Sequence, residues 1–165
     1  MVKMDAMKEA SVRAFELLKA RGEHVSFAES LTGGLIAATM IENPGASAVI
    51  NESYVTYAEA SKAHILGVEW YTIEHDGVVS ANCAYEMAMG VRRISRADWG
   101  VSATGLAGPD GGTEQTPVGT VFIGVAGRKN AQAYECHFAG DRMQVRRQAV
   151  QAAFELLAEA MLAEE

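Results

Sequence analysis

Residues 24–41, HVSFAESLTGGLIAATMI, contain a strand, a tight turn and the beginning of a helix in one continuous stretch. His24–Ala28 has the composition of a short β-strand, and the small polar residues of Glu29–Gly34 interrupt it. Apolar residues at helical spacing then resume over Leu35–Ile41. A strand that runs through a tight turn into a helix begins a βα unit, so this stretch predicts an α/β fold.

The segments on either side continue the alternation of helices and strands. Upstream, the apolar residues of Asp5–Ala20 fall near one stripe, which predicts an amphipathic helix that ends at Gly22. Downstream, the β-branched and aromatic run Ala48–Tyr57 predicts a second strand. The remaining expected elements are helices over Glu59–Leu66, Ser80–Arg96 and Asp141–Ala163, and strands over Trp99–Thr104, Val118–Ala126 and Ala131–Phe138.

Two connections between these elements are informative. The glycine- and proline-rich segment Gly105–Gly119 predicts a loop that is long for a simple connection, and functional loops are often of this kind. Residues Gly127–Asn130 between the last two strands predict a hairpin. Helices that alternate with strands, followed by one hairpin, indicate a mixed sheet with helices on both faces. Ligands of such sheets bind beyond the carboxyl ends of parallel strands, where the first turn and the long loop both lie.

The composition restricts the size and setting of the protein. The chain has 165 residues, of which 49% are hydrophobic, and this suits one domain over residues 1–165. Its formal charge of -7 repels phosphodiester backbones, so nucleic acid is not expected as a partner. Cys83 and Cys136 lack metal-type spacing, and no signal or membrane-spanning segment is evident. We therefore expect free thiols and a cytoplasmic protein without a membrane partner.

The turn AESLTGG over residues 28–34 carries the first candidate site residues. Ser30 and Thr32 supply hydroxyl groups, and Gly33 and Gly34 let the backbone approach a ligand closely. Free N–H groups at the start of the following helix would bind an oxyanion or a phosphate. The alternative is that a hydroxyl only caps the helix and the glycines only form the turn.

Tyr57 and Lys62 lie five positions apart, across the end of a strand and the first turn of a helix, so both side chains can converge on one cleft. A serine nucleophile needs a base, and lysine serves when burial lowers its pKa from about 10.4 towards neutrality. A tyrosine hydroxyl can relay the proton or orient the amine. The alternative is a solvated surface lysine beside a half-buried tyrosine.

Other titratable residues give weaker indications. The loop carboxylates Asp110 and Glu114 could bind a divalent cation, but solvated or capping roles are commoner, and we expect no metal. A Ser-His-Asp triad that joins Ser30 to His64 stays open. The four histidines have no metal-type spacing, and they are His24, His64, His75 and His137.

Two arginines share a face at the start of the expected last helix. Arg142 and Arg146 are four positions apart, and cations near a helix amino terminus oppose its dipole unless an anion compensates. A substrate phosphate is one such anion. Asp141 or a neighbouring subunit is the alternative partner.

Seven motifs extend over nearly the whole chain, and they are AESLTGG (28–34), NPGAS (43–47), VTYAEASK (55–62), GVVS (77–80), TGLAGPDGG (104–112), PVGTVFIGVA (117–126) and GDRMQVRRQAV (140–150). In this order they resemble the CinA C-terminal domain family, in its stand-alone form, the nicotinamide-nucleotide amidases. The resemblance implies hydrolysis of nicotinamide mononucleotide, a small-molecule nucleotide, to nicotinate mononucleotide and ammonia without a cofactor. It also implies a three-layer α/β/α sandwich with a five-stranded mixed, mostly parallel sheet, and a homo-oligomer.

The resemblance also implies roles for individual positions. The family's nucleophilic serine falls on Ser30, its tyrosine on Tyr57 and its lysine on Lys62. Ser47 matches the serine after the proline-glycine turn and is expected to bind substrate. The other residues expected to bind substrate are Thr32, Gly33, Gly34, Gly105, Gly108 and Arg142.

Two positions depart from the usual pattern of the family. Leu31 stands where the family usually has cysteine, and AEAS at residues 58–61 stands where SNEA is usual. An inactive nucleotide-binding module and a serine-lysine amidase for another small amide therefore stay open as alternatives. Turnover of an amide would exclude the inactive nucleotide-binding module. A requirement for the substrate phosphate would exclude the amidase for another small amide.

Overall fold

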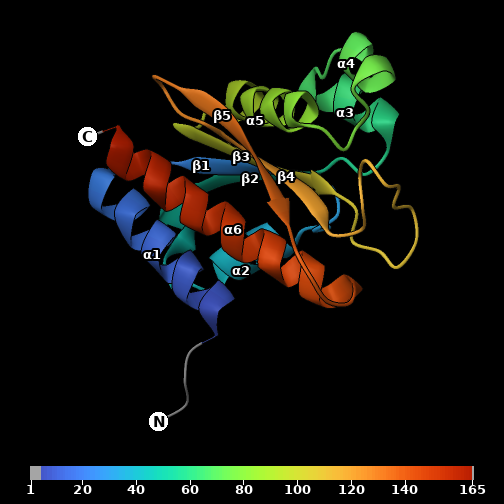
Figure 1. Ribbon diagram of the computed structural model, residues 1–165. Coiled ribbons are helices and arrows are strands. Elements are labelled where there is room, and N and C mark those ends of the chain that lie inside the picture. Colours follow the sequence, from blue (N-terminus) through green and yellow to red (C-terminus); the bar gives the residue numbers. More distant parts are fainter. Residues whose placement is uncertain (1–4, 165) are drawn as a thin grey trace.

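The computed structural model describes residues 5–164, which form a β-sheet between two layers of helices (Figure 1). The helices are α1 (Ala6–Arg21), α2 (Leu35–Ile41), the 3₁₀ helix η1 (Ala46–Ala48), α3 (Glu59–Leu66), α4 (Trp70–His75), α5 (Ala81–Ser95) and α6 (Arg142–Ala163). The strands are β1 (Val25–Glu29), β2 (Ile50–Val55), β3 (Trp99–Gly105), β4 (Thr120–Ala126) and β5 (Ala131–His137). The expected three-layer α/β/α architecture is confirmed.

The sheet is mixed and has the strand order β2-β1-β3-β4-β5. β1 pairs in parallel with β2 and β3, so Val25 lies opposite both Ile50 and Trp99. β4 is antiparallel to both of its neighbours and therefore runs against the other four strands. The five-stranded, mixed and mostly parallel sheet that the resemblance implies is thus confirmed.

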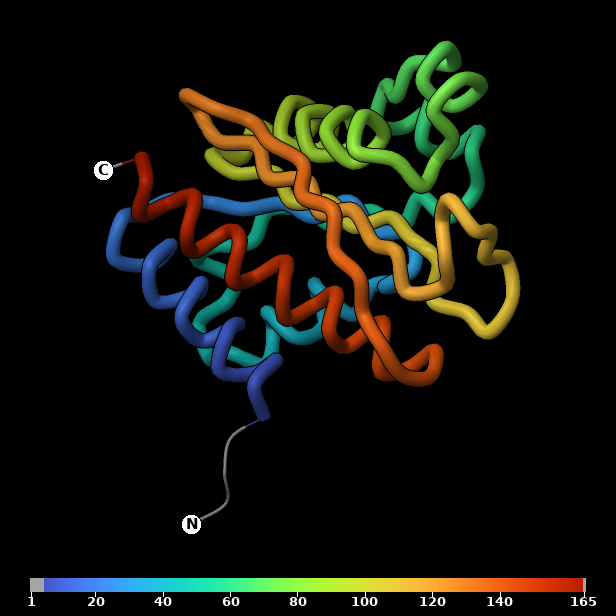
Figure 2. The backbone as a smooth tube through the Cα atoms, viewed as in Figure 1, coloured from blue at the N-terminus to red at the C-terminus, as the bar shows by residue number. Residues whose placement is uncertain are grey.

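Each face of the sheet carries its own helical layer. α1, α2 and α6 cover one face, whereas α5 covers the other with α3 and α4 packed against it (Figures 1 and 2). Side chains alternate between faces along a strand, so Phe27 and Ala28 enter different cores. The ring of Phe27 meets Phe154 of α6 edge-on at a centroid distance of 6.0 Å, and Ala28 belongs to a cluster with Met87 of α5. Apolar contacts thus fix β1 from both sides.

Two glycines allow α5 to approach its neighbours closely. A Cβ atom at Gly124 of β4 would lie 2.2 Å from Ala84 O, and one at Gly90 of α5 would lie 2.0 Å from Leu66 O. Alanine at either position would therefore push the two elements apart. Gly90 matters for the candidate site because Leu66 belongs to α3, the helix that also carries Lys62.

The helices and strands expected from the sequence are all present, with ends within two residues of those predicted. Ser80 caps α5 as expected, since its Oγ accepts a hydrogen bond from Cys83 N at 3.1 Å. Asp141 and Gln144 form a capping box at the start of α6. The short helices η1 and α4 were not predicted, because elements of this length do not show a helical period.

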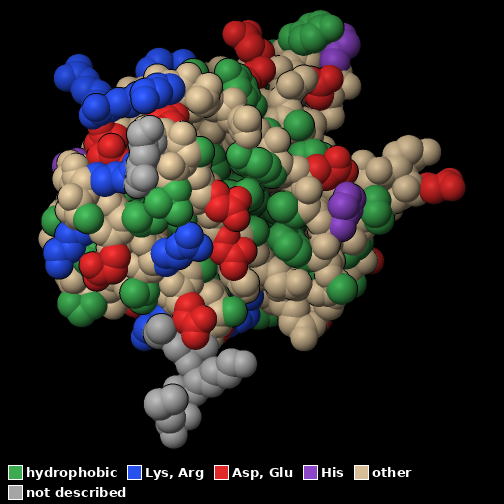
Figure 3. Space-filling model, turned by 60° about the vertical axis from the view of Figure 1, so that its left-hand side comes forward, with side chains coloured by type: hydrophobic (Ala, Val, Ile, Leu, Met, Phe, Trp, Pro, Cys, Tyr) green, Lys and Arg blue, Asp and Glu red, His purple; other side chains and the backbone are tan. Residues whose placement is uncertain are grey.

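Charged side chains are unevenly distributed on the face shown in Figure 3. Lysine and arginine side chains gather at one upper corner of this view, whereas acidic, basic and apolar side chains are mixed over the rest. In the β4–β5 hairpin, Arg128 forms an ion pair with Asp98, and Lys129 donates to Glu164 O at 3.5 Å. The charge of Arg128 is therefore compensated by a carboxylate, whereas Lys129 contacts a main-chain carbonyl. Within residues 5–164, no helix is both long and apolar enough to cross a bilayer.

Candidate active site

The candidate cleft opens where the carboxyl ends of β1 and β3 meet. Ser30 follows β1 directly, and Gly105 is the last residue of β3. The cleft has a volume of about 130 Å³. This edge of the sheet is the position at which α/β folds bind ligands. The lining residues are Ser30, Leu31, Tyr57, Gly105, Leu106, Ala107, Gly108, Asp110 and Arg142.

Lys62 lies against Ser30 and is buried from solvent. Its side chain is 1% exposed, and Nζ lies 3.0 Å from Oγ of Ser30. Nζ also donates to Thr56 O at 2.6 Å and to Tyr57 O at 3.3 Å. A neutral amine has two hydrogens and one lone pair, so donation to these two carbonyls leaves the lone pair for the hydroxyl hydrogen of Ser30. The arrangement is that of a serine activated by an adjacent amine base.

The surroundings of Lys62 favour the neutral amine. Burial lowers the pKa of Lys62 from 10.5, whereas negative charge on Cys83 or Glu59 acts in the opposite direction. Burial also raises the pKa of the Cys83 thiol to about 11, so this neighbour is uncharged at neutral pH. The amine is therefore easier to deprotonate than that of a solvated lysine.

Glu29 occupies the amino end of α2, which we expected to bind an anion. The side chain is fully buried, and its carboxylate accepts hydrogen bonds from Ile36 N at 2.9 Å and Ala37 N at 3.1 Å. Within the turn, the N–H of Gly33 donates to Ser30 O at 3.1 Å. The expectation that the start of this helix binds an oxyanion or a phosphate is therefore wrong, because the protein's own carboxylate already accepts from these donors.

Tyr57 contacts Lys62 through its main-chain carbonyl, whereas its phenol turns towards α6. The ring is 63% exposed, and Nη2 of Arg142 donates to the Tyr57 hydroxyl at 3.4 Å. Nη1 of Arg142 donates to Gly108 O at 2.7 Å, so the glycine-rich loop is also attached to α6. Tyr57 and Arg142 thus meet at the mouth of the cleft. The direct contact of Ser30 with Lys62 needs no tyrosine relay.

Several residues that we expected to bind substrate have no side chain in the lining of the cleft. The side chain of Thr32 is fully buried, and its Oγ1 has no hydrogen-bond partner among residues 5–164. Gly33 and Gly34 adopt φ values of 59° and 98°, so they serve the turn, as the alternative interpretation proposed. Ser47 is exposed in η1, and β2 separates it from the cleft. Leu106, Ala107 and Asp110 line the cleft as part of the glycine-rich loop 105–112 that the resemblance placed at the pocket, and Leu31 lines it although it was not among the expected substrate-binding residues.

The basic group within hydrogen-bond distance of Ser30 is the amine of Lys62 and not a histidine. His64 is exposed on α3 and lines a separate hollow of about 550 Å³ together with Trp70. In the part of the chain that the structure describes, no histidine is hydrogen-bonded to Ser30, so the geometry does not support a triad through His64. Among the same residues, no group of three or more His, Cys, Asp or Glu side chains is placed to hold a metal ion.

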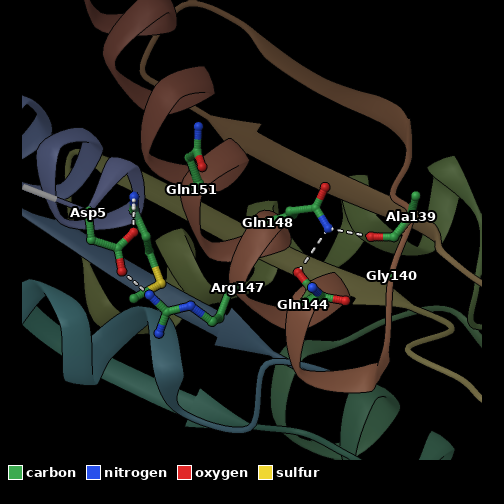
Figure 4. A pocket seen from close by; sticks show the side chains of 8 residues that line it. Asp5, Ala139, Gly140, Gln144, Arg147, Gln148 and Gln151 are labelled. Atoms are coloured by element: carbon green, nitrogen blue, oxygen red, sulfur yellow. Dashed lines mark hydrogen bonds and ion pairs between the residues drawn. The ribbon is translucent and has the colours of Figure 1, made fainter.

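A larger hollow between α1 and α6 lacks comparable chemistry (Figure 4). It has a volume of about 480 Å³ and lies beside the ion pair of Asp5 with Arg147. The Gln148 amide donates to Ala139 O at 2.8 Å and to Gln144 O at 3.0 Å, as the dashed lines show. These amides and the paired charges supply no nucleophile beside a base. The smaller cleft at Ser30 is therefore the better candidate.

Comparison with known protein families matches residues 7–161 to the CinA C-terminal domain. The chain belongs to the CinA C-terminal domain family. One relative, the CinA-like protein of Anaeromyxobacter sp. (strain K), is 47% identical over 140 residues, which cover 85% of this chain and 34% of that protein. The chain thus spans about a third of the length of such CinA-like relatives.

Other proteins match this CinA-type chain over nearly the whole length of both sequences. Nicotinamide-nucleotide amidohydrolase PncC of Enterobacter agglomerans is 45% identical over 144 residues, which cover 87% of this chain and 88% of that protein. The crystal structure of the competence/damage inducible protein CihA from Agrobacterium tumefaciens has a TM-score of 0.92 and 36% identity. The matched region covers 98% of this chain and 99% of the CihA chain. The CinA-type fold therefore extends over the whole region that forms the cleft.

Leu31 stands where the family resemblance led us to expect a cysteine. The side chain is 5% exposed, belongs to the apolar core and lines the cleft beside Ser30. Leucine has no nucleophilic atom. In this turn the hydroxyl of Ser30 is therefore the nucleophilic group with an amine within hydrogen-bond distance.

Proposed function

We propose that this chain acts as one domain and is an amidohydrolase that converts nicotinamide mononucleotide to nicotinate mononucleotide and ammonia. The observation that carries the proposal is the 3.0 Å separation between Oγ of Ser30 and Nζ of the buried Lys62. The 45% identity to a protein named nicotinamide-nucleotide amidohydrolase supports both the reaction and the substrate. Ser30 is the proposed nucleophile and Lys62 the proposed base.

The proposed reaction has two half-reactions that use the same two residues. Oγ of Ser30 attacks the carboxamide carbon while its proton moves to Nζ of Lys62. Lys62 then protonates the amide nitrogen, the C–N bond breaks, and ammonia leaves an acyl ester on Ser30. Water, deprotonated by Lys62, attacks that ester. The product leaves as the carboxylic acid while the proton returns to Oγ of Ser30, and it then loses a proton to solvent to give the carboxylate.

The N–H groups of Leu31 and Thr32 are the proposed donors to the oxyanion. Both directly follow the nucleophile, and within residues 5–164 neither donates a hydrogen bond to another residue. The neighbouring N–H of Gly33 is already bonded to Ser30 O. A well-placed donor of this kind lowers the barrier by about 3–4 kcal/mol.

The size of the cleft suits one end of the substrate. Its volume of about 130 Å³ is below the roughly 300–1,000 Å³ of sites that enclose a whole ligand. The carboxamide ring would enter the cleft, and the ribose phosphate would lie at the mouth. There Arg142 offers positive charge to the phosphate, and Asp110 offers a carboxylate acceptor to the ribose hydroxyls.

Ammonia release from the purified protein tests the proposal. We expect release from nicotinamide mononucleotide with a chelator present, and no release from nicotinamide or nicotinamide riboside measured in parallel. Ser30→Ala should lower kcat about 10⁴-fold or more while circular dichroism shows an intact fold.

Each other outcome points to a different function. Turnover retained by Ser30→Ala would contradict the nucleophile assignment. Binding of the mononucleotide by the wild-type protein without ammonia release would favour a nucleotide-binding module. Equal release from the riboside would favour an amidase for another small amide.

A further inference from the structure

Arg146 of α6 reaches across to the turn that carries Ser30. Its half-buried guanidinium donates from Nε to Leu31 O at 2.8 Å and from Nη2 to Thr32 O at 3.0 Å. Within the described residues 5–164, Arg146 forms no ion pair with a carboxylate. Its positive charge is therefore directed at two main-chain carbonyls, which belong to the two residues directly after the nucleophile.

Each of these carbonyls shares a rigid peptide plane with the N–H of the next residue. In a trans peptide the two groups point in opposite directions, so a carbonyl that is held fixes the direction of the N–H. Leu31 O thereby orients the N–H of Thr32. Thr32 O orients the N–H of Gly33, which donates to Ser30 O at 3.1 Å and so orients the N–H of Leu31. Thr32 O also accepts from Leu35 N at 3.0 Å, so Arg146 and this main-chain bond together fix the proposed oxyanion donors.

Charge adds to this geometric effect. A cation beside a carbonyl polarises the whole peptide unit and strengthens its N–H as a donor, and a low local dielectric increases the effect. Leu31 is 5% exposed and Thr32 is fully buried, so the two peptides are shielded from solvent. The planar guanidinium can bind both carbonyls at once, which the ammonium group of lysine does less well.

We propose that Arg146 is a positioning residue that holds the N–H groups of Leu31 and Thr32 for the oxyanion and does not touch the substrate. The inference rests on the proposed amidohydrolase function of Ser30. It differs from the phosphate-binding role considered for Arg142 and Arg146, because Arg142 lines the cleft and Arg146 does not.

Arg146→Ala and the matched variant Arg142→Ala separate positioning from phosphate binding. We expect Arg146→Ala to lower kcat for nicotinamide mononucleotide about 10²-fold, the loss typical of one misplaced oxyanion donor. KM and the inhibition constant of inorganic phosphate should change by less than about threefold. Guanidinium ion in the assay should restore part of kcat, whereas Arg142→Ala should raise both KM and the phosphate inhibition constant.

The opposite pattern would overturn the inference. A loss in Arg146→Ala that is confined to KM, or a rise in the phosphate inhibition constant equal to that in Arg142→Ala, would mean that Arg146 binds the phosphate. If Arg146→Ala does not fold, Arg146→Lys is the second variant, because it keeps the charge without the planar fork. Arg146→Lys should also lower kcat, but by a smaller factor than Arg146→Ala.

Hydrogen exchange of residues 30–36 tests the positioning role without turnover. We expect Arg146→Ala to accelerate exchange of these amides about tenfold or more, while exchange of β4 stays unchanged. Absence of ammonia release from the wild-type protein would contradict the proposed function, and this exchange measurement would then still decide the role of Arg146. Unchanged exchange of residues 30–36 would overturn the inference even if activity fell.

Discussion

Nζ of Lys62 lies 3.0 Å from Oγ of Ser30, although 32 positions separate the two residues in the chain. The contact forms because the turn after β1 and the helix α3 meet at the carboxyl end of the sheet. Thr56 O and Tyr57 O accept hydrogen bonds from the amine, and burial lowers the pKa of Lys62. The protonation state of this buried amine therefore affects both the stability of the fold and the reactivity of Ser30.

Replacement of Lys62 by methionine should stabilise the fold at neutral pH. Because burial lowers the pKa of Lys62 in the folded state, the unfolded chain binds more protons between that lowered pKa and 10.5. The free energy of unfolding of the wild-type protein should therefore rise with pH across this window. Lys62→Met should be more stable below the window and should lack this slope.

Urea unfolding of both proteins, from neutral pH to about pH 10, measures this difference. Ser30→Ala serves as the control, because it keeps the buried amine and should retain the wild-type slope. A Lys62→Met variant that is less stable than the wild-type protein at neutral pH would contradict the proposed cost of burying the amine.

An acid at position 83 should shift the pH dependence of turnover. The Cys83 thiol is neutral at neutral pH because burial raises its pKa to about 11. A carboxylate there would stabilise the ammonium form of Lys62 and raise its pKa, and position 83 lies in the first turn of α5, where negative charge interacts favourably with the helix dipole. Cys83→Asp should therefore move the acidic limb of the kcat/KM profile to higher pH and lower kcat/KM at neutral pH about tenfold or more.

The matched variant Cys83→Ala introduces no charge and should leave the acidic limb in place. Profiles of kcat/KM against pH for the two variants and the wild-type protein provide the comparison. Equal shifts in both variants would show that packing around Lys62, and not charge, sets the pH dependence.

The phenol of Tyr57 should be dispensable for proton transfer. Its hydroxyl accepts a hydrogen bond from Arg142 at 3.4 Å, whereas its main-chain carbonyl contacts Lys62. Tyr57→Phe should leave the acidic limb of the pH profile unchanged and raise KM by at most about tenfold, the value of one hydrogen bond. A shift of the acidic limb of the pH profile, or a kcat lowered about 10²-fold, would instead show that the phenol takes part in proton transfer.

The sequence predicted the elements well because nearly all of them have a simple period or a clear stop signal. Strand β1, its turn and α2 follow directly from residues 24–41. The six residues of α4 are too few for a period to be visible. The strand order β2-β1-β3-β4-β5 was not predicted, because periodicity indicates which residues form a strand and not which strands are neighbours.

Contacts between distant segments explain what the sequence could not predict in the site. Spacing indicated that Tyr57 and Lys62 face one cleft, but it could not show that the phenol turns towards Arg142. Glu29 directly precedes Ser30 in the sequence, but its role as the anion at the start of α2 depends on the path of the turn. The contacts of Arg146 with that turn join residues 115 and 114 positions apart.

Removal of the Glu29 carboxylate should destabilise the fold. The fully buried carboxylate accepts hydrogen bonds from Ile36 N at 2.9 Å and Ala37 N at 3.1 Å. Glu29→Ala would leave both N–H groups unpaired in the core, which should lower the free energy of unfolding by about 2–4 kcal/mol. Glu29→Gln keeps one acceptor oxygen, so its free energy of unfolding, measured by urea unfolding, should fall by about half as much. A Glu29→Ala variant with the same free energy of unfolding as the wild-type protein would contradict this prediction. Other groups would then have to accept from these N–H donors, and the start of α2 would be open to an anion.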